Sequence, residues 1–194
     1  MDYQPNAVVI GASAGALESL YQILPSLPPE YRLPIIIVVH IPPDKKSIMA
    51  DLLQSKCAIR VVEAQDKEPL QKGTAYIAPP DYHVLVEKNG RLSLSSEEPV
   101  LYSRPSIDVL FETASDAYGS ALIGVILSGA NSDGVKGLKS IINAGGTGIV
   151  LDPDLAYAPT MPQAAQNACP TAHILNFEQI TDYLQKAALS CLSL

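Results

Sequence analysis

The sequence predicts an α/β fold: a three-layer α/β/α, doubly wound domain with a mostly parallel sheet and one added antiparallel hairpin. Its apolar segments lack a clean alternation of apolar and polar residues, as expected of parallel strands that are covered on both faces. Between many of them lie segments with apolar residues at three- and four-residue spacing, which is typical of helices that pack one stripe against a sheet. Alternation of the two kinds of segment along the chain indicates the α/β class.

The predicted strands are apolar runs that share this pattern. In chain order they are Ala7 to Ile10, Ile35 to Val39, Ala58 to Val62, Thr74 to Ile77, Ala121 to Leu127 and Thr147 to Leu151. The predicted helices are Leu17 to Leu24, Ser47 to Gln54, Ser106 to Tyr118, Val135 to Asn143 and Asn176 to Leu189. Ser106 can cap the third helix, which Gly119 follows, and Asn176 with Gln179 resembles a capping box.

One segment, VLVEKNGRLSLS, departs from the parallel pattern. It places Asn89-Gly90 between two runs of β character, which is the sequence signature of a tight hairpin turn. Two Pro-rich stretches, PSLPPEYRLP and Ile41 to Pro43, are predicted as loops because the strand pattern resumes directly after them. Residues 1–194 are therefore expected to form a single domain, and the length suits one sizeable core.

The composition narrows the class of protein. With 13 basic and 20 acidic residues the net charge is -7, so the surface would repel a phosphate backbone and nucleic acid is not an expected partner. No segment approaches the roughly 20 apolar residues that span a bilayer, and MDYQPN lacks the features of a signal peptide. We expect a cytoplasmic chain without membrane insertion. Cys57, Cys169 and Cys191 show no spacing typical of a metal or redox site.

Three polar residues are predicted at the carboxyl edge of the sheet, where doubly wound folds gather their reactive groups. Ser13 follows the first strand, His40 ends the run IIIVVH, and Asp133 follows the strand ALIGVILS through the turn GANSD. A serine hydroxyl becomes a good nucleophile when a base takes its proton, and the base needs a carboxylate to hold its tautomer. The three residues therefore predict nucleophilic catalysis.

Simpler interpretations remain open for each of the three residues. Ser13 and Asp133 each stand just before a helix, where Ser and Asp are favoured as N-caps. His40 can be a strand-end residue that bonds a loop carbonyl. Of the other histidines, His83 in the lead-in to the hairpin and His173 near the last strand are expected to be structural.

The loop GASAGA admits a second functional interpretation, a phosphate-binding loop. It has neither the G-x-G-x-x-G spacing nor the Gly-Lys-Ser/Thr ending of nucleotide-binding loops, so a nucleotide site is the weaker hypothesis. Its small residues allow close approach of a substrate, and the start of the following helix offers amide donors for an oxyanion. The sequence G-A-S-A-G matches the nucleophile elbow of α/β-hydrolases. In that class the triad follows the chain order Ser, acid, His, whereas here the order is Ser13, His40, Asp133, which argues against an α/β-hydrolase.

Motifs along nearly the whole chain resemble one family. GASAGA, HIPP, YIAPPDYHVLV, RPSIDVLFETAS, LSGANSDGVKGLKSIINAGG and APTMPQAA follow one another as in the catalytic domain of the chemotaxis protein-glutamate methylesterase family, CheB. The resemblance implies a serine esterase that hydrolyses γ-glutamyl methyl esters on the cytoplasmic helices of chemoreceptors, often with deamidation of receptor glutamines. It also implies Ser13, His40 and Asp133 as the triad. No metal or organic cofactor is required by this chemistry.

The chain departs from the family pattern beside the nucleophile and the acid. Ala14, Gly15 and Ala16 stand where the family commonly has Thr and two glycines, and Ala130 and Asn131 replace a common Met-Gly. We expect two backbone amides to hold the oxyanion: that of Ala14, near the start of the helix after Ser13, and that of Ala130. The substitutions do not remove these donors, because a backbone donor does not depend on the side chain.

Other expectations concern regulation and substrate contacts. Classical members carry an N-terminal receiver domain; this chain is then a separate catalytic module, a fragment of a longer protein, or a relative regulated by another partner such as a separate receiver protein. Arg104 either contacts the receptor's acidic surface or forms a structural salt bridge, which is the favoured alternative. Met161 is expected to be packing. A catalytically weak or inactive CheB-like binding module is the alternative to the enzyme.

Overall fold

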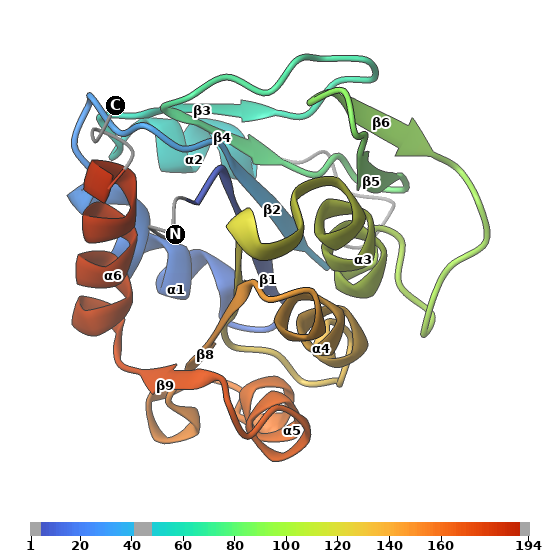
Figure 1. The fold of residues 1–194 in the computed structure, drawn as a ribbon, viewed down its shortest axis with the longest axis vertical. Helices are drawn as coiled ribbons and strands as arrows, with labels where there is room; N and C mark the ends of the chain where they lie inside the picture. The colour runs from blue at the N-terminus through green and yellow to red at the C-terminus, as the bar shows by residue number, and fades with distance from the viewer. Residues whose placement is uncertain (1–4, 41–47, 191–194) are drawn as a thin grey trace.

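The computed structural model describes residues 5–40 and 48–190 of the chain. The predicted loop at Ile41 to Pro43, the predicted helix start at Ser47 and Cys191 lie outside these residues. A seven-stranded sheet forms the centre of the molecule (Figure 1), and all its strand pairs are parallel. In spatial order its strands are β3 (Arg60–Glu63), β4 (Thr74–Ile77), β2 (Ile35–Val39), β1 (Ala7–Ala12), β7 (Leu122–Ile126), β8 (Thr147–Leu151) and β9 (His173–Leu175).

Helices cover both faces of this sheet, so the predicted three-layer α/β/α fold is confirmed (Figure 1). One face carries α1 (Ala16–Ile23), α2 (Met49–Gln54) and α6 (Phe177–Ser190). The other face carries α3 (Ile107–Tyr118), α4 (Val135–Asn143) and α5 (Thr160–Ala168). Short 3-10 turns lie at η1 (Leu24–Ser26), η2 (Gly119–Ala121) and η3 (Pro153–Leu155).

Strand β1 shows why the strands lack hydropathic alternation. Successive side chains of a strand point to opposite faces of the sheet. Val8 and Ile10 therefore join the core beneath α1 and α6, while Ala7 and Val9 join the core beneath α3 and α4, and all four are fully buried. Because both faces are covered, every position of the strand is apolar.

The predicted hairpin is present as a two-stranded antiparallel sheet of its own, made of β5 (His83–Val86) and β6 (Leu92–Ser95). Its turn is closed by the Gly90 amide, which donates to the Glu87 carbonyl at 2.9 Å, and Gly90 has a φ of +75°. The hairpin lies against α3, and the Thr113 hydroxyl oxygen accepts from the Val86 amide at 3.2 Å. The Asn89-Gly90 prediction is therefore confirmed.

The strand order places the start of the chain in the middle of the sheet. From β1 the chain builds β2, β4 and β3 on one side and later β7, β8 and β9 on the other. This reversal of direction is a topological switch point, beyond which the carboxyl ends of neighbouring strands open a crevice. The ends of β1, β2 and β7 meet there. No helix in residues 5–40 and 48–190 has both the length and the apolar character needed to cross a bilayer.

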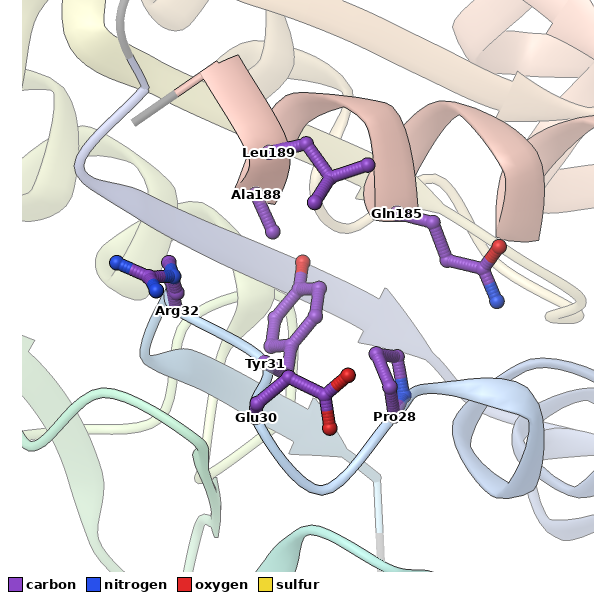
Figure 2. A pocket seen from close by; sticks show the side chains of 7 residues that line it. All are labelled: Pro28, Glu30, Tyr31, Arg32, Gln185, Ala188 and Leu189. Carbon is purple, nitrogen blue, oxygen red and sulfur yellow. The ribbon is translucent and has the colours of Figure 1, made fainter. Parts of the chain in front are cut away.

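A separate cavity of about 340 Å³ lies between the segment after η1 and the last turns of α6 (Figure 2). Its lining residues come from neither the strand ends nor the loops at the switch point; they are Pro28, Glu30, Tyr31, Arg32, Gln185, Ala188 and Leu189. This cavity and the switch point are therefore built from different segments of the chain.

Candidate active site

The backbone brings the segments of Ser13, His40 and Asp133 together at the switch point. Ala12 pairs with Val39 in the register of β1 and β2, so Ser13 and His40 follow paired residues. The His40 amide donates to the Ala12 carbonyl at 3.3 Å, and the Ser13 amide donates to the Ser128 carbonyl at 2.8 Å, just beyond β7. All three residues lie at the carboxyl edge, as the sequence predicts.

The loop that carries Ser13 turns into α1 through Gly15. Gly15 has a φ of +78°, in the left-handed region that favours glycine, and a Cβ there would lie 2.5 Å from the Tyr157 Cβ. Gly15 is also the N-cap of α1 and has no side-chain cap. The Ser13 side chain is half-buried and makes no hydrogen bond within the described part of the chain. The N-cap interpretation of Ser13 is therefore wrong.

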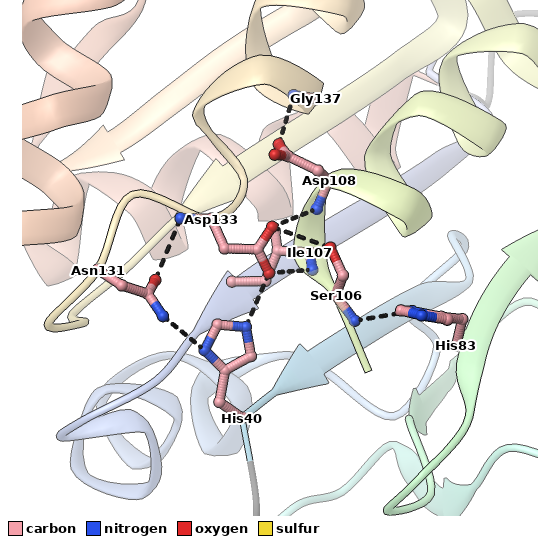
Figure 3. Close-up of polar contacts among 8 residues, drawn as sticks. All are labelled: His40, His83, Ser106, Ile107, Asp108, Asn131, Asp133 and Gly137. Carbon is pink, nitrogen blue, oxygen red and sulfur yellow. Dashed lines mark hydrogen bonds and ion pairs between the residues drawn. The ribbon is translucent and has the colours of Figure 1, made fainter. Parts of the chain in front are cut away.

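His40 and Asp133 form a direct pair. The Nε2 atom of His40 lies 2.8 Å from Oδ2 of Asp133 (Figure 3). The imidazole is 13% exposed, whereas the carboxylate is fully buried. A buried carboxylate beside an imidazole holds one tautomer of the ring and stabilises its cation.

The Asp133 carboxylate also holds the start of α3. Its Oδ1 accepts from the Ser106 hydroxyl at 2.9 Å and from the Asp108 amide at 3.0 Å, and its Oδ2 accepts from the Ile107 amide at 2.7 Å. The alternative interpretation of Asp133 as the N-cap of the following helix is wrong, because Gly134 is the N-cap of α4 and Asp133 binds the first turn of α3. Ser106 stands at the N-cap of α3, but its hydroxyl donates to Asp133.

These contacts fix the charge of Asp133. Burial by itself raises the pKa of the carboxyl, but the hydrogen bonds from His40, Ile107 and Asp108 outweigh it and lower the pKa below its ordinary value. Asp133 is therefore an anion at neutral pH. As an ionised carboxylate it can only accept, so the Nε2–H of His40 donates to it, and in the neutral ring Nδ1 is the nitrogen that carries a lone pair.

A second buried acid, Asp108, lies behind the pair and was not predicted from the sequence. Its Oδ1 accepts from the Gly137 amide in α4 at 2.7 Å. Burial raises the pKa of Asp108 to about 6, the Gly137 amide opposes that rise, and the charges of Asp133 and Glu112 add to it. An acidic residue in the first turn of a helix is common, so no sequence signal distinguishes this one.

Asn131 is the other contact that the sequence did not predict. Its Oδ1 accepts from the Asp133 amide at 3.1 Å, and its Nδ2 lies 3.2 Å from Nδ1 of His40 (Figure 3). In the sequence Asn131 stood out only as a departure from the family pattern. The departure places a carboxamide directly on the ring of the candidate base.

The two amides expected to hold the oxyanion, those of Ala14 and Ala130, donate to no acceptor within residues 5–40 and 48–190. Their loops are joined, because the Ser128 hydroxyl donates to the Ala14 carbonyl at 2.6 Å and accepts from the Ala158 amide at 2.8 Å. Ala14 is half-buried and Ala130 is exposed. Free amides on adjoining loops are the donors that an oxyanion needs.

The remaining candidates have structural surroundings. Arg104 donates to Asp81 at 2.6 Å and to the carbonyls of Ser96 and Glu97, which agrees with the salt-bridge interpretation. Its guanidinium is thus held by acceptors of the protein itself.

His83, His173 and Met161 also have surroundings that fit structural roles. His83 is buried; its Nδ1 accepts from the Ser106 amide at 3.1 Å, and its Nε2 donates to a loop carbonyl. His173 is exposed in β9, with its ring 5.9 Å from that of Tyr183. Met161 is fully buried, and a Cβ on Gly129 would lie 2.4 Å from its Cε. The described part of the chain holds no cluster of three metal-binding side chains.

Comparison with known proteins agrees with this geometry. The model of the CheB methylesterase family matches residues 8–184. A relative from Leptospira interrogans is 46% identical over 182 residues, which cover 94% of this chain and 93% of the relative. The protein-glutamate methylesterase/protein-glutamine glutaminase of Trichodesmium erythraeum is 36% identical over 178 residues, which cover 90% of this chain and 51% of that protein.

A solved structure shows the same fold. The crystal structure of the Thermotoga maritima CheB methylesterase catalytic domain aligns with a TM-score of 0.89 and 33% identity, over 94% of this chain and 98% of that chain. The family match, the relatives and the fold agree with the six ordered motifs in the sequence. The chain belongs to the CheB methylesterase family.

Proposed function

We propose that this protein is a serine esterase that hydrolyses glutamyl methyl esters on the cytoplasmic domain of chemoreceptors. The names of its relatives support this reaction, and they add deamidation of protein glutamine as a second activity. The observation that carries the proposal is the 2.8 Å contact between His40 and the buried anion Asp133. His40 follows β2, which pairs with β1, the strand that Ser13 follows. No observation on the described residues favours a catalytically inactive binding module.

The reaction starts with the hydroxyl of Ser13. Its Oγ attacks the ester carbonyl while Nδ1 of His40 accepts the Oγ proton, and Asp133 stabilises the imidazolium that forms. The tetrahedral intermediate then collapses: the bond to the methoxy oxygen breaks, and His40 returns the proton to the departing methanol. A glutamyl ester of Ser13 remains.

Water completes the cycle by the same route. His40 accepts a proton from water, the hydroxide oxygen attacks the acyl-enzyme, and Oγ of Ser13 leaves with that proton. The products are the receptor carboxylate and a free Ser13. In deamidation the same steps release ammonia in place of methanol, because an amide nitrogen occupies the place of the methoxy oxygen.

The amides of Ala14 and Ala130 supply the oxyanion donors in this proposal. Both are free of protein acceptors in the described residues, and both lie on loops that the Ser128 hydroxyl joins. Developing negative charge on the ester oxygen is stabilised by such preorganised donors, which act without side-chain chemistry. The alanines at these positions therefore leave this function intact.

Methanol release from a methylated receptor fragment tests the proposal. We expect Ser13→Ala and His40→Ala each to lower the rate at least about a thousandfold, and the double variant to be scarcely slower than either single one, because the residues act as a unit. Ser13→Ala should keep the stability of the wild type within about 0.5 kcal/mol, since its hydroxyl makes no hydrogen bond in the described residues.

The matched control is Ser55→Ala, which removes an exposed hydroxyl at the end of α2. We expect its rate to equal that of the wild type. Full methanol release by a folded Ser13→Ala protein, checked by circular dichroism, would contradict covalent catalysis at Ser13.

A further inference from the structure

The carboxamide of Asn131 lies against His40 at Nδ1, the ring nitrogen that accepts the Ser13 proton in the proposed reaction. It comes from the loop between β7 and α4 and lies at Nδ1 of His40, whereas Asp133 lies at Nε2 of the same ring (Figure 3). The two ring nitrogens are thus both engaged: Nε2 by the Asp133 carboxylate and Nδ1 by the Asn131 amide. No role has been assigned to Asn131 so far.

The hydrogen bonds fix which end of the carboxamide faces the ring. Its oxygen must accept from the Asp133 amide, which can only donate, so the NH2 group is the end beside His40. This NH2 group can only donate, and it therefore needs a lone pair on Nδ1. Asp133 independently requires the proton on Nε2. Both contacts select the same neutral tautomer, with hydrogen on Nε2 and a lone pair on Nδ1.

This tautomer is the one that the reaction needs, because Nδ1 is the nitrogen with a lone pair for the Ser13 proton. An imidazolium ring would turn an N–H toward the NH2 group of Asn131, so the contact is lost on protonation. Among residues 5–40 and 48–190 the charged group in contact with the ring is Asp133, from the loop before α4, and Asp108 of α3 lies behind it. Asp133 favours the cation, whereas Asn131 favours the neutral ring.

We propose that Asn131 is a positioning residue that keeps His40 neutral and holds its Nδ1 lone pair toward Ser13 in the resting enzyme. It then releases Nδ1 when the Ser13 hydroxyl enters to be deprotonated. The contact is a single hydrogen bond between neutral groups at 3.2 Å, which is strong enough to bias the ring and weak enough to break in each turnover. The proposal rests on the esterase function proposed above.

Nuclear magnetic resonance of 15N-labelled histidine tests this directly, with no need for activity. The chain has three histidines, and a His40→Gln variant identifies the His40 signals. In the wild type we expect the neutral ring to carry its hydrogen on Nε2. In Asn131→Ala we expect the titration midpoint of the ring to rise by about half to one pH unit, because the donor that favours the neutral ring is gone.

Asn131→Asp gives a second, nearly isosteric variant. Its carboxylate can still accept from the Asp133 amide, but it cannot donate to Nδ1 and it attracts the imidazolium, so the midpoint should rise further than in the alanine variant. Ser132→Ala is the matched control: it changes an exposed residue of the same loop and should leave the midpoint unchanged. Circular dichroism confirms the fold of each variant.

The acidic limb of kcat/KM against pH provides the second readout, with methylated receptor as substrate. We expect this limb to stay in place in Ser132→Ala, to move to higher pH in Asn131→Ala and to move further in Asn131→Asp. Equal midpoints in all three variants, or hydrogen on Nδ1 of the wild-type ring, would overturn the role of Asn131 whether or not the protein is active. Shifted midpoints in a protein without esterase activity would support the positioning role and refute the proposed function.

Discussion

At the scale of single residues, the carboxylate of Asp133 contacts both His40 and the start of α3. It orients His40 through one oxygen, and both oxygens together receive the first backbone amides of α3 and the Ser106 hydroxyl. Hydrogen bonds to a buried anion are among the stronger ones in proteins, and removing the charge weakens all of them at once. If Asp133 acts as proposed, we therefore expect catalysis and stability to be coupled at this position.

Asp133→Asn should be impaired in both respects. We expect methanol release to fall by as much as roughly ten-thousandfold, because an asparagine misorients the imidazole. The free energy of unfolding should fall by about 2 to 4 kcal/mol, because a neutral amide replaces a buried anion that accepts four hydrogen bonds. Urea denaturation and the methanol assay measure the two effects.

Ser106→Ala separates the two tasks. It removes one donor to Asp133 without touching His40, so we expect a stability loss of about 1 kcal/mol and less than a tenfold change in rate. An Asp133→Asn protein with wild-type stability would show that the contacts to α3 contribute nothing to folding.

At the scale of elements, the packing of α3 against α4 sets the position of the acid. Gly137 in α4 faces α3 so closely that a Cβ there would lie 2.5 Å from the Phe111 Cβ and 3.2 Å from the Asp108 Cα. The same turn of α3 binds Asp133 through the Ile107 and Asp108 amides. The spacing between these helices is thus transmitted to the site through a short path of contacts.

Gly137→Ala should push the two helices apart. Overpacking of a filled interface costs about 1 to 3 kcal/mol, and we expect the melting temperature and the rate of methanol release to fall together. Lys139→Ala, on the exposed side of the same helix, should change the stability by no more than about 0.5 kcal/mol and leave the rate unchanged. A Gly137→Ala variant that loses stability but keeps full activity would show that the helix spacing does not reach Asp133.

The elements differ in how well the sequence predicts them. The segments Ile35 to Val39, Thr74 to Ile77 and Thr147 to Leu151 were predicted with the bounds that the structure has, because burial on both faces leaves an uninterrupted apolar run. Strand β9 and helix α5 were given no bounds among the predicted strands and helices. Strand β9 has only three residues at a half-exposed edge, and α5 is short with few large apolar residues.

The site was predictable for the residues whose position depends on topology alone. Ser13, His40 and Asp133 follow strands, and parallel strands bring their carboxyl ends to one edge. Asn131 and Asp108 were not predictable, because their roles depend on which ring nitrogen faces which loop and on which helix meets which carboxylate. Such orientations come from packing between distant segments and leave no local pattern in the chain.

At the scale of the whole molecule, Asp108 and Asp133 give the stability opposite dependences on pH. The raised pKa of Asp108 means that the folded state binds its proton more tightly than the unfolded chain does. Its contribution is fully present below the ordinary value of 3.8 and is lost as the pH rises through about 6. The lowered pKa of Asp133 gives stability that is present above its ordinary value and is lost as the pH falls through its folded value.

Asp108→Asn should remove the first of these dependences. The variant keeps an oxygen for the Gly137 amide but carries no charge. The wild type should therefore lose about 2 kcal/mol of stability relative to the variant between pH 4 and pH 7. Urea denaturation at a series of pH values measures the difference. The control is Asp116→Asn, on the exposed side of α3. A difference between variant and wild type that is constant with pH would contradict the raised pKa.

The central place of β1 has a consequence for the synthesis of the protein. Strand β1 pairs with β2, which follows soon after it, and with β7, which begins only at Leu122. The ribosome makes the chain from the N-terminus onward, so the edge of β1 that pairs with β7 has no partner until the residues between the two strands have been made. Asp133 also follows His40 by more than ninety residues, so the pair of His40 and Asp133 on which the proposed esterase mechanism depends cannot form until Asp133 has left the exit tunnel.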